Sequence, residues 1–246
     1  MGYYKLKLAL MQPTFNPWIG YFDLIDYVDK FIFLDTVQLN QQSWQTRNKF
    51  KIQDKELLFS IPILKEKSKY ELLIKDTKIN FNKFDFRKKL VKTVEQNYKK
   101  AKYFNEVNDF IQELIQYDTP YLSKYNINII MQIAKKLNFN TEILILSKSN
   151  YRGELSKGNL VLDICKHFST TDYISPLGSK EYLDKEIPKF NNSNIEVFYQ
   201  YYQHPTYNQL GEKFIPYIGI FDLLYNEGFE NSAKIIRSGR DYKKAE

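Results

Sequence analysis

The sequence is short of the residues that form disulfides and metal centres. Its 246 residues include one cysteine and two histidines, which excludes an internal disulfide and any metal site built on a cysteine cluster. Cys165 lies on the apolar side of a predicted helix, as expected of a buried structural thiol. The sequence contains no HExxH motif, acid cluster or Ser–His–Asp pattern. It therefore predicts neither a metal site nor a serine nucleophile.

Long apolar runs are also lacking, and glycine and proline are scarce, with nine and eight residues. The scarcity of glycine and proline argues against long flexible linkers. The apolar run near the N-terminus is too short for a signal peptide or membrane anchor, and no stretch has the length of a transmembrane helix. We expect a cytoplasmic protein without membrane insertion. We also expect one domain over residues 1–246, with a helical insertion at about 80–137.

What the sequence does have is an excess of positive charge, concentrated in one segment. The net charge is +7, and residues 75–102 hold ten basic and three acidic side chains, a difference equal to that of the whole chain. An apolar stripe at every fourth residue (Phe86, Leu90, Val94, Tyr98) predicts a helix here. The lysines then cover its outer face. Such a face is either plainly solvated or a surface for a phosphate-rich partner, such as a nucleotide, an acidic lipid surface or tRNA.

Strand and helix patterns alternate along the chain, apart from a helical middle. Strand-like segments at 3–12 and 30–35 flank a helical segment at 18–28, a β–loop–α–β unit typical of a parallel sheet. A polar stretch at 38–51 precedes a strand-like segment at 57–64, and helical spacing follows near 83–100, 104–117 and 121–137. Strands and helices alternate again from 142 to 202. The sequence predicts an α/β fold with a Rossmann-like, mainly parallel sheet and a helical insertion.

Polar side chains at the expected strand ends are the first candidates for a ligand site. Ligands of open α/β sheets bind beyond the carboxyl ends of the strands. Gln12 and Asn16 follow the first strand, and Asp35 and Gln38 follow the next. We expect them to converge on one pocket. The substrate-binding candidates at the start of the first helix are Trp18 and Tyr21.

Two further segments carry candidate binding residues. The amide-rich stretch at 35–51 adds Trp44, Arg47 and Asn48, a set that suits a polar, ring-shaped ligand such as a sugar or nucleotide. The alternative is an ordinary polar surface loop. In "YISPLGSKEYL", Lys180 and Tyr182 follow a strand end, where a helix N-terminus favours phosphate or carboxylate. This segment is not a Walker A motif.

The two histidines differ in their expected roles. His167 lies in an apolar-periodic helix with Cys165, which favours a structural role. His204 follows a strand and precedes a proline, so we expect it on the rim of the sheet, where it can serve as a general base. Asp35 and Asp222 are the candidate carboxylates that orient or assist it.

One unusual pattern occurs near each end of the chain. "QPTFNPWIGYFDLI" begins at Gln12, and "HPTYNQLGEKFIPYIGIFDLL" begins at His204; the two align once residues 209–215 are removed. Matching apolar residues of the helical parts are accounted for by core packing. The polar parts are not, so we predict that the two loops face each other across one site, with Gln12 and His204 on opposite lips.

These motifs together resemble the WbqC-like protein family. The resemblance rests on Gln12-Pro13, the "PWIGYFD" and "DTVQ" segments, Trp44 and Arg47-Asn48, and on "YISPLGSKEYL", His204-Pro205 and "IGIFDLLYNEG" towards the C-terminus. It covers nearly the whole chain. Many relatives have serine where this chain has Gly219. A weaker resemblance links residues 9–34 to the opening of nucleotidylyltransferases and pantothenate synthetases, but "WIGY" stands where those enzymes have their H-x-G-H pair.

The family resemblance implies a role in the biosynthesis of bacterial surface polysaccharides such as O-antigen. The first hypothesis is an enzyme that transfers an acyl or aminoacyl group to the amino group of a nucleotide-linked amino sugar. In it His204 deprotonates the amine, Arg47 and Lys180 bind the diphosphate, and Trp44 and Tyr21 pack on a ring. The alternatives are an ATP- or aminoacyl-tRNA-dependent ligase or transferase and a non-catalytic binding subunit. The cofactor and the donor are left open.

Overall fold

A six-stranded sheet forms the centre of the computed structural model, which describes residues 5–40, 43–64, 72–153 and 157–246. Its order is β5 (Glu142–Ile145), β2 (Lys30–Phe33), β1 (Lys7–Met11), β6 (Asp172–Pro176), β7 (Glu196–Gln200) and β8 (Tyr242–Lys244). The first five strands are parallel, and β8 pairs antiparallel with β7. The predicted α/β fold with a mainly parallel, Rossmann-like sheet is confirmed.

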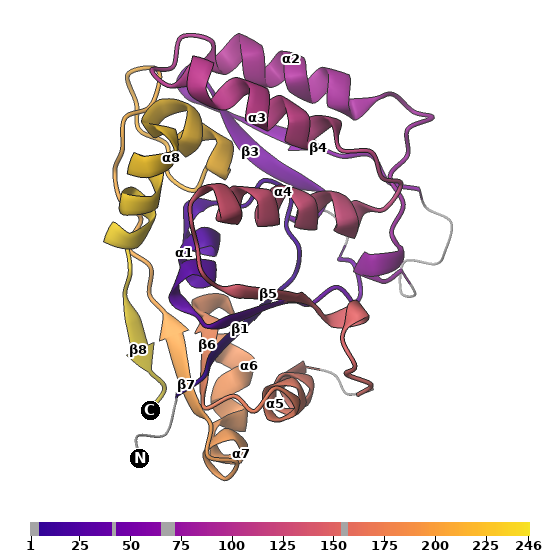
Figure 1. Cartoon of the computed structure of the whole chain (residues 1–246), viewed down its shortest axis with the longest axis vertical. Helices are drawn as coiled ribbons and strands as arrows, with labels where there is room; N and C mark the ends of the chain where they lie inside the picture. The colour runs from indigo at the N-terminus through magenta and orange to yellow at the C-terminus, as the bar shows by residue number, and fades with distance from the viewer. Residues whose placement is uncertain (1–4, 41–42, 65–71, 154–156) are drawn as a thin grey trace.

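Alternate residues of the strands pack into two separate hydrophobic cores, one on each face. Ala9 and Phe31 join the core beneath α1 (Ile19–Tyr27), α4 (Leu122–Lys136) and α8 (Ile220–Ser238). Leu8, Leu10 and Ile32 join the other core, with α5 (Lys157–His167), α6 (Lys180–Leu183) and α7 (Ile187–Asn191). Figure 1 shows these two groups of helices on opposite sides of the sheet. Cys165 is fully buried in the second core, as predicted.

The segment predicted as a helical insertion contains α2 (Phe86–Tyr98), α3 (Phe104–Gln116) and α4. The stripe predicted for α2 is buried along its whole length, and the helix is capped at its start by the Asp85 side chain, which accepts from the Arg87 amide. The lysines of α2 therefore face outward, and Figure 1 places α2 at the outermost layer of the molecule. Short 3-10 turns, η1 (Ile74–Asp76), η2 (Leu146–Lys148), η3 (Leu177–Ser179) and η4 (Asp184–Glu186), connect other elements.

A second, two-stranded sheet adds a strand that was not predicted. β3 (Arg47–Ile52) begins within the polar stretch at 38–51, and it pairs antiparallel with β4 (Lys55–Ser60), which overlaps the strand predicted at 57–64. The polar residues Asn48 and Lys51 of β3 are buried alongside Phe50. A strand that buries an amide and an ammonium group lacks the apolar alternation by which strands are recognised. β8 was also not predicted, because its three residues are mostly polar.

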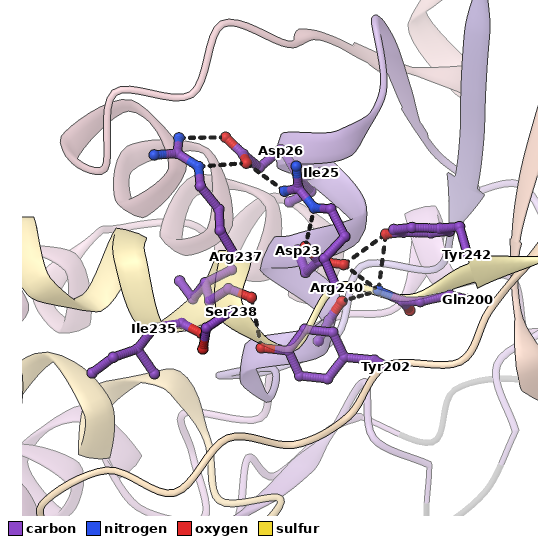
Figure 2. A network of polar contacts seen from close by, with 12 residues as sticks. Asp23, Ile25, Asp26, Gln200, Tyr202, Ile235, Arg237, Ser238, Arg240 and Tyr242 are labelled. Atoms are coloured by element: carbon purple, nitrogen blue, oxygen red, sulfur yellow. Dashed lines mark hydrogen bonds and ion pairs between the residues drawn. The ribbon is translucent and has the colours of Figure 1, made fainter.

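A buried ion-pair network fastens the C-terminal residues to α1 (Figure 2). The carboxylate of Asp23, which is fully buried, accepts from Arg240 Nε at 2.7 Å, Tyr242 OH at 2.7 Å and Gln200 Nε2 at 3.0 Å. Arg240 and Arg237 also both donate to Asp26. Burial raises the pKa of Asp23, an effect that its hydrogen bonds with Arg240 and Tyr242 counteract. Asp23 is thus a structural partner of β7, β8 and the segment that joins α8 to β8.

Candidate functional site

One candidate site lies where the strand order of the sheet reverses. The chain runs from β1 outward to β2 on one side, and β6 lies against β1 on the other. A cleft of about 580 Å³ opens beside the carboxyl ends of β1, β2 and β6. Its lining consists of Gln12, Leu34, Val37, Asn40, Leu160, Val161, Gly178, Glu181, Tyr182 and Lys185. Open α/β sheets bind ligands at this position because neighbouring loops diverge there.

Gln12 and Tyr182 are the predicted substrate-binding residues that line this cleft. The Gln12 main-chain carbonyl accepts from Tyr21 OH at 2.9 Å, and its side-chain Oε1 accepts from Gln45 Nε2 at 2.5 Å. These contacts fix the residue at the end of β1. Glu181 and Lys185 were not predicted: Glu181 lies within the segment "YISPLGSKEYL", and Lys185 lies two residues beyond its end.

A second, smaller hollow lies on the other side of the end of β1. Its volume is about 250 Å³, and its lining consists of Met11, Thr14, Trp18, Tyr21, Trp44, Asn48, Lys49 and Tyr217. Met11 lines this hollow and the next residue, Gln12, lines the cleft, so the two cavities flank the carboxyl end of β1. We call the smaller one the aromatic hollow. It gathers four of the predicted binding residues: Trp18, Tyr21, Trp44 and Asn48.

Asn16 and Asn48 brace the loop between β1 and α1. Asn16 is fully buried with a φ of 41°, and its Oδ1 accepts from the Phe221 amide at 3.2 Å. Asn48 Nδ2 donates to the main-chain carbonyls of Phe15 and Asn16, at 2.9 and 2.8 Å. The Asn48 side-chain amide therefore satisfies main-chain groups of this loop. Asn16 joins the loop to α8 through its Oδ1, while its buried Nδ2 has no hydrogen-bond partner in the described part of the chain.

Four other predicted residues lie outside both cavities. The Asp35 carboxylate accepts from the amide of Ser147 at 3.0 Å and from its hydroxyl at 2.5 Å, which joins the ends of β2 and β5. Gln38 is exposed, in a short antiparallel bridge. Lys180 pairs with Asp184 at 2.6 Å. Arg47 begins β3, and its buried Nε has no hydrogen-bond partner in the described part of the chain.

Main-chain groups occupy both ring nitrogens of His204. Nδ1 lies 2.9 Å from the Pro205 carbonyl, and Nε2 accepts from the Tyr217 amide at 3.1 Å. Since an amide can only donate, Nε2 must be the unprotonated nitrogen. Burial lowers the pKa of His204, which favours this neutral form. The geometry gives His204 the task of holding Tyr217 in place.

Asp222 is buried at the start of α8 and does not contact His204 directly. Its Oδ2 accepts from Tyr207 OH at 2.9 Å, and the Tyr207 ring lies beside that of His204. Burial raises the pKa of Asp222 to about 6. Within the described ranges, no hydrogen bond joins His204 to Asp35 or Asp222. The three candidate catalytic residues are therefore not arranged as a hydrogen-bonded triad.

The two similar stretches of sequence pack against each other. The main chain of Trp18 forms an antiparallel bridge with Gly219, and the Ile220 amide donates to the Pro17 carbonyl at 2.9 Å. The aligned residues Trp18 and Tyr217 touch edge to face and both line the aromatic hollow. Neither Gln12 nor His204 lines it. The two stretches meet through rings, with Tyr217 and His204 both packed on Trp18, and not through Gln12 opposite His204.

The alignment of the two stretches does not hold at the helix starts. α1 begins at Ile19, whereas α8 begins at Ile220, two positions beyond the aligned Ile218. Asp23 and Asp222, which align in sequence, accordingly have different partners. In the structure, the two stretches share a loop that places an aromatic side chain, Trp18 or Tyr217, shortly before a helix.

Among the residues that the structure describes, no three His, Cys, Asp or Glu side chains lie close enough together to hold a metal ion. None of the described helices is both long and apolar enough to cross a membrane.

The fold and the site define an α/β protein with a cleft at the switch point of its sheet. This chain belongs to the WbqC-like protein family, whose model matches residues 12–234. It is also similar to the uncharacterized protein Rv1507c of Mycobacterium tuberculosis, with 29% identity over 228 residues that cover 91% of this chain and 95% of that protein. No solved structure matches the chain.

Proposed function

We propose that this protein is an enzyme of bacterial surface-glycan biosynthesis that transfers an acyl or aminoacyl group to the amino group of a nucleotide-linked amino sugar. The observation that carries the proposal is the cleft at the point where the strand order reverses. The glycan context comes from the association of the family with surface-polysaccharide clusters.

The lining of the cleft suits a ligand with both apolar and charged parts. Its volume of about 580 Å³ lies within the range of clefts that enclose small-molecule ligands. Leu34, Val37, Leu160 and Val161 offer apolar surface for a base and ribose, and Lys185 offers a cation for the diphosphate. Lys185 replaces Arg47 and Lys180 in this role, because neither of those lines the cleft.

The proposed step forms an amide and needs a proton acceptor. The sugar nitrogen attacks the carbonyl carbon of an activated acyl ester, a C–N bond forms, and the ester oxygen leaves with the electron pair of the broken C–O bond. The nitrogen loses one proton. We assign that proton to Glu181, an exposed carboxylate in the cleft lining, because the nitrogens of His204 are engaged and Asp35 and Asp222 are buried.

The test compares the mass of the surface glycan from a deletion strain complemented with different variants. We expect the deletion to remove the mass of one acyl or aminoacyl group per repeat, and Glu181→Gln to restore little of it. Glu113→Gln, which changes an exposed carboxylate on α3, is the matched control and should restore it fully. An unchanged glycan in the deletion strain would refute the enzyme and favour a role without catalysis.

A second candidate for the donor is an aminoacyl-tRNA, favoured by the outer face of α2 and its surroundings. Seven lysines are exposed here: Lys83, Lys88, Lys89, Lys92, Lys99, Lys100 and Lys102. Binding of tRNA to this face would weaken steeply as salt rises, because bound phosphates release counterions. A titration with bulk tRNA between 50 and 300 mM salt tests it; no binding at the lowest salt would remove this donor.

A further inference from the structure

We propose that the aromatic hollow is the subsite for the pyranose ring, in which Trp44 and Tyr217 pack on the sugar and His204 positions Tyr217. The inference deepens the proposed function and rests on it for the identity of the sugar. It assigns the two cavities different parts of one substrate, with the nucleotide in the cleft and the sugar ring in the hollow. The amino group of that ring must then reach around the end of β1 to the cleft, where Glu181 lies.

The first support is the exposure of the two aromatic side chains. Tyr217 is 53% and Trp44 50% exposed, the highest values among the large hydrophobic residues that the structure describes, and both line this hollow. Isolated exposed aromatics are ordinary, but two on one concavity indicate a binding surface. The electron-rich face of an aromatic ring attracts the weakly positive C–H groups on the face of a pyranose.

The second support is the size and polarity of the hollow. Its volume of about 250 Å³ lies below the usual range for clefts that enclose drug-sized ligands, so it suits one ring rather than a whole nucleotide. Thr14 Oγ1 donates to the Gln12 carbonyl at 3.3 Å and keeps lone pairs for a sugar hydroxyl. Lys49, whose ammonium pairs with Glu56 at 2.8 Å, also lines the hollow.

The polar groups fit a sugar better than a nucleobase. A base edge is read by paired donors and acceptors, typically from a side-chain amide. Asn48 has the one side-chain amide in this lining, and its Nδ2 is used by Phe15 and Asn16 while its Oδ1 accepts from the Lys49 amide.

The third support is the way in which Tyr217 is held. Its φ is 59°, a left-handed conformation that is unfavourable for a bulky residue and persists only where its surroundings impose it. The His204 ring accepts the Tyr217 amide, stacks on Trp18 with centroids 6.1 Å apart, and meets the Tyr217 ring at 5.0 Å. The C-terminal stretch thus holds an aromatic side chain out into the hollow.

Intrinsic fluorescence provides a direct test, because both tryptophans of the chain line the hollow. The full chain is titrated with methyl glucosaminide and other methyl amino-pyranosides, alone and then with uridine diphosphate and UDP-glucosamine. We expect the pyranosides to change the fluorescence, and Tyr217→Ala and Trp44→Ala to lower their affinity by roughly five- to tenfold each. Trp18 remains as the reporter in Trp44→Ala. Tyr117→Ala, an exposed aromatic at the end of α3, is the control and should have no effect.

The outcomes separate this inference from the proposed function. A pyranoside response that depends on Trp44 and Tyr217, with no binding of any nucleotide sugar, supports the subsite and counts against the proposed function. Binding of UDP-glucosamine without any pyranoside response overturns the subsite. So does a loss of affinity for uridine diphosphate in Tyr217→Ala and Trp44→Ala that equals their loss of affinity for UDP-glucosamine.

The role of His204 is tested separately. His204→Ala should weaken pyranoside binding several-fold, and His204→Gln, whose side-chain oxygen can accept the Tyr217 amide, should restore both binding and glycan modification. Restored binding with lost modification would show that His204 is a catalytic base instead of a positioning residue.

Discussion

Replacing Asp222 by asparagine should make the protein more stable at neutral and alkaline pH. The carboxyl group is 1% exposed, with one hydrogen bond, from Tyr207 OH to Oδ2. Oδ1 has no hydrogen-bond partner among the described residues, and the Tyr98 hydroxyl beside it also lacks one. Lys51 is a nearby cation that lowers the pKa of Asp222, and its ammonium donates to the Lys213 carbonyl. An ionised carboxylate is therefore poorly compensated at this position.

The size of the effect follows from the pKa of Asp222. Burial raises it to about 6 from an ordinary value of 3.8, so the folded chain binds the proton more tightly than the unfolded chain. Proton binding by Asp222 therefore contributes to the free energy of unfolding. This contribution is complete below about pH 4 and is lost as the pH rises through 6. Above that, the folded state carries the full cost of ionisation, about 3 kcal/mol at most. In Asp222→Asn the amide oxygen still accepts from Tyr207, and Nδ2 faces the Tyr98 oxygen.

Urea unfolding from pH 4.5 to 8.5 measures the difference between Asp222→Asn and the wild type. We expect the free energy of unfolding of the variant to exceed that of the wild type by about 1–3 kcal/mol at pH 8, with little difference at the acid end. Asp109→Asn, an exposed change on α3, should show no such pH dependence. A variant clearly less stable than wild type at pH 8 would refute the reasoning and show that Lys51 compensates an ionised Asp222.

Two further predictions concern packing around the site. Arg240→Ala leaves Asp23 buried without its cation and should lower the free energy of unfolding by about 3–5 kcal/mol. Lys244→Ala, which removes an exposed pair with Glu196, should lower it by less than about 1 kcal/mol. Equal effects of the two variants would contradict the structural role given to the Asp23 network. A Cβ at Gly219 would lie 2.1 Å from Asn16 Nδ2, so Gly219→Ala should destabilise by about 1–3 kcal/mol. At Gly178 a Cβ would meet nothing within 4 Å, and a Gly178→Ala variant as unstable as Gly219→Ala would show that steric contact is not the cause.

The fold was predictable wherever burial gives the apolar residues a clear periodicity in the sequence. β1, α1 and β2 read correctly, as did the stripe of α2, because their apolar residues follow the spacing of strands and helices. β3 did not, since Asn48 and Lys51 are buried through hydrogen bonds that only the tertiary structure supplies. The pairing of β8 likewise depends on contacts with β7, and on Tyr242 reaching Asp23 across the fold.

The site was predictable in position but less so in the task of each residue. Strand ends and aromatic residues located Gln12, Trp18, Tyr21, Trp44 and Tyr182 in the two cavities. Residue type did not reveal that the Asn48 and Asp35 side chains and Asn16 Oδ1 form hydrogen bonds with nearby backbone and hydroxyl groups. Tyr217 was not predicted, although it aligns with Trp18, which was predicted to bind substrate.

The most direct test of the central claim is the pool of nucleotide sugars in a strain that lacks this gene, measured by mass spectrometry. Transfer to a nucleotide-linked amino sugar predicts that an unmodified form with a free amine accumulates, and that its acylated counterpart disappears and returns on complementation. A nucleotide-sugar pool identical to that of the wild type, in a strain whose glycan has nevertheless lost the group, would place the reaction after the sugar has left the nucleotide and contradict the account.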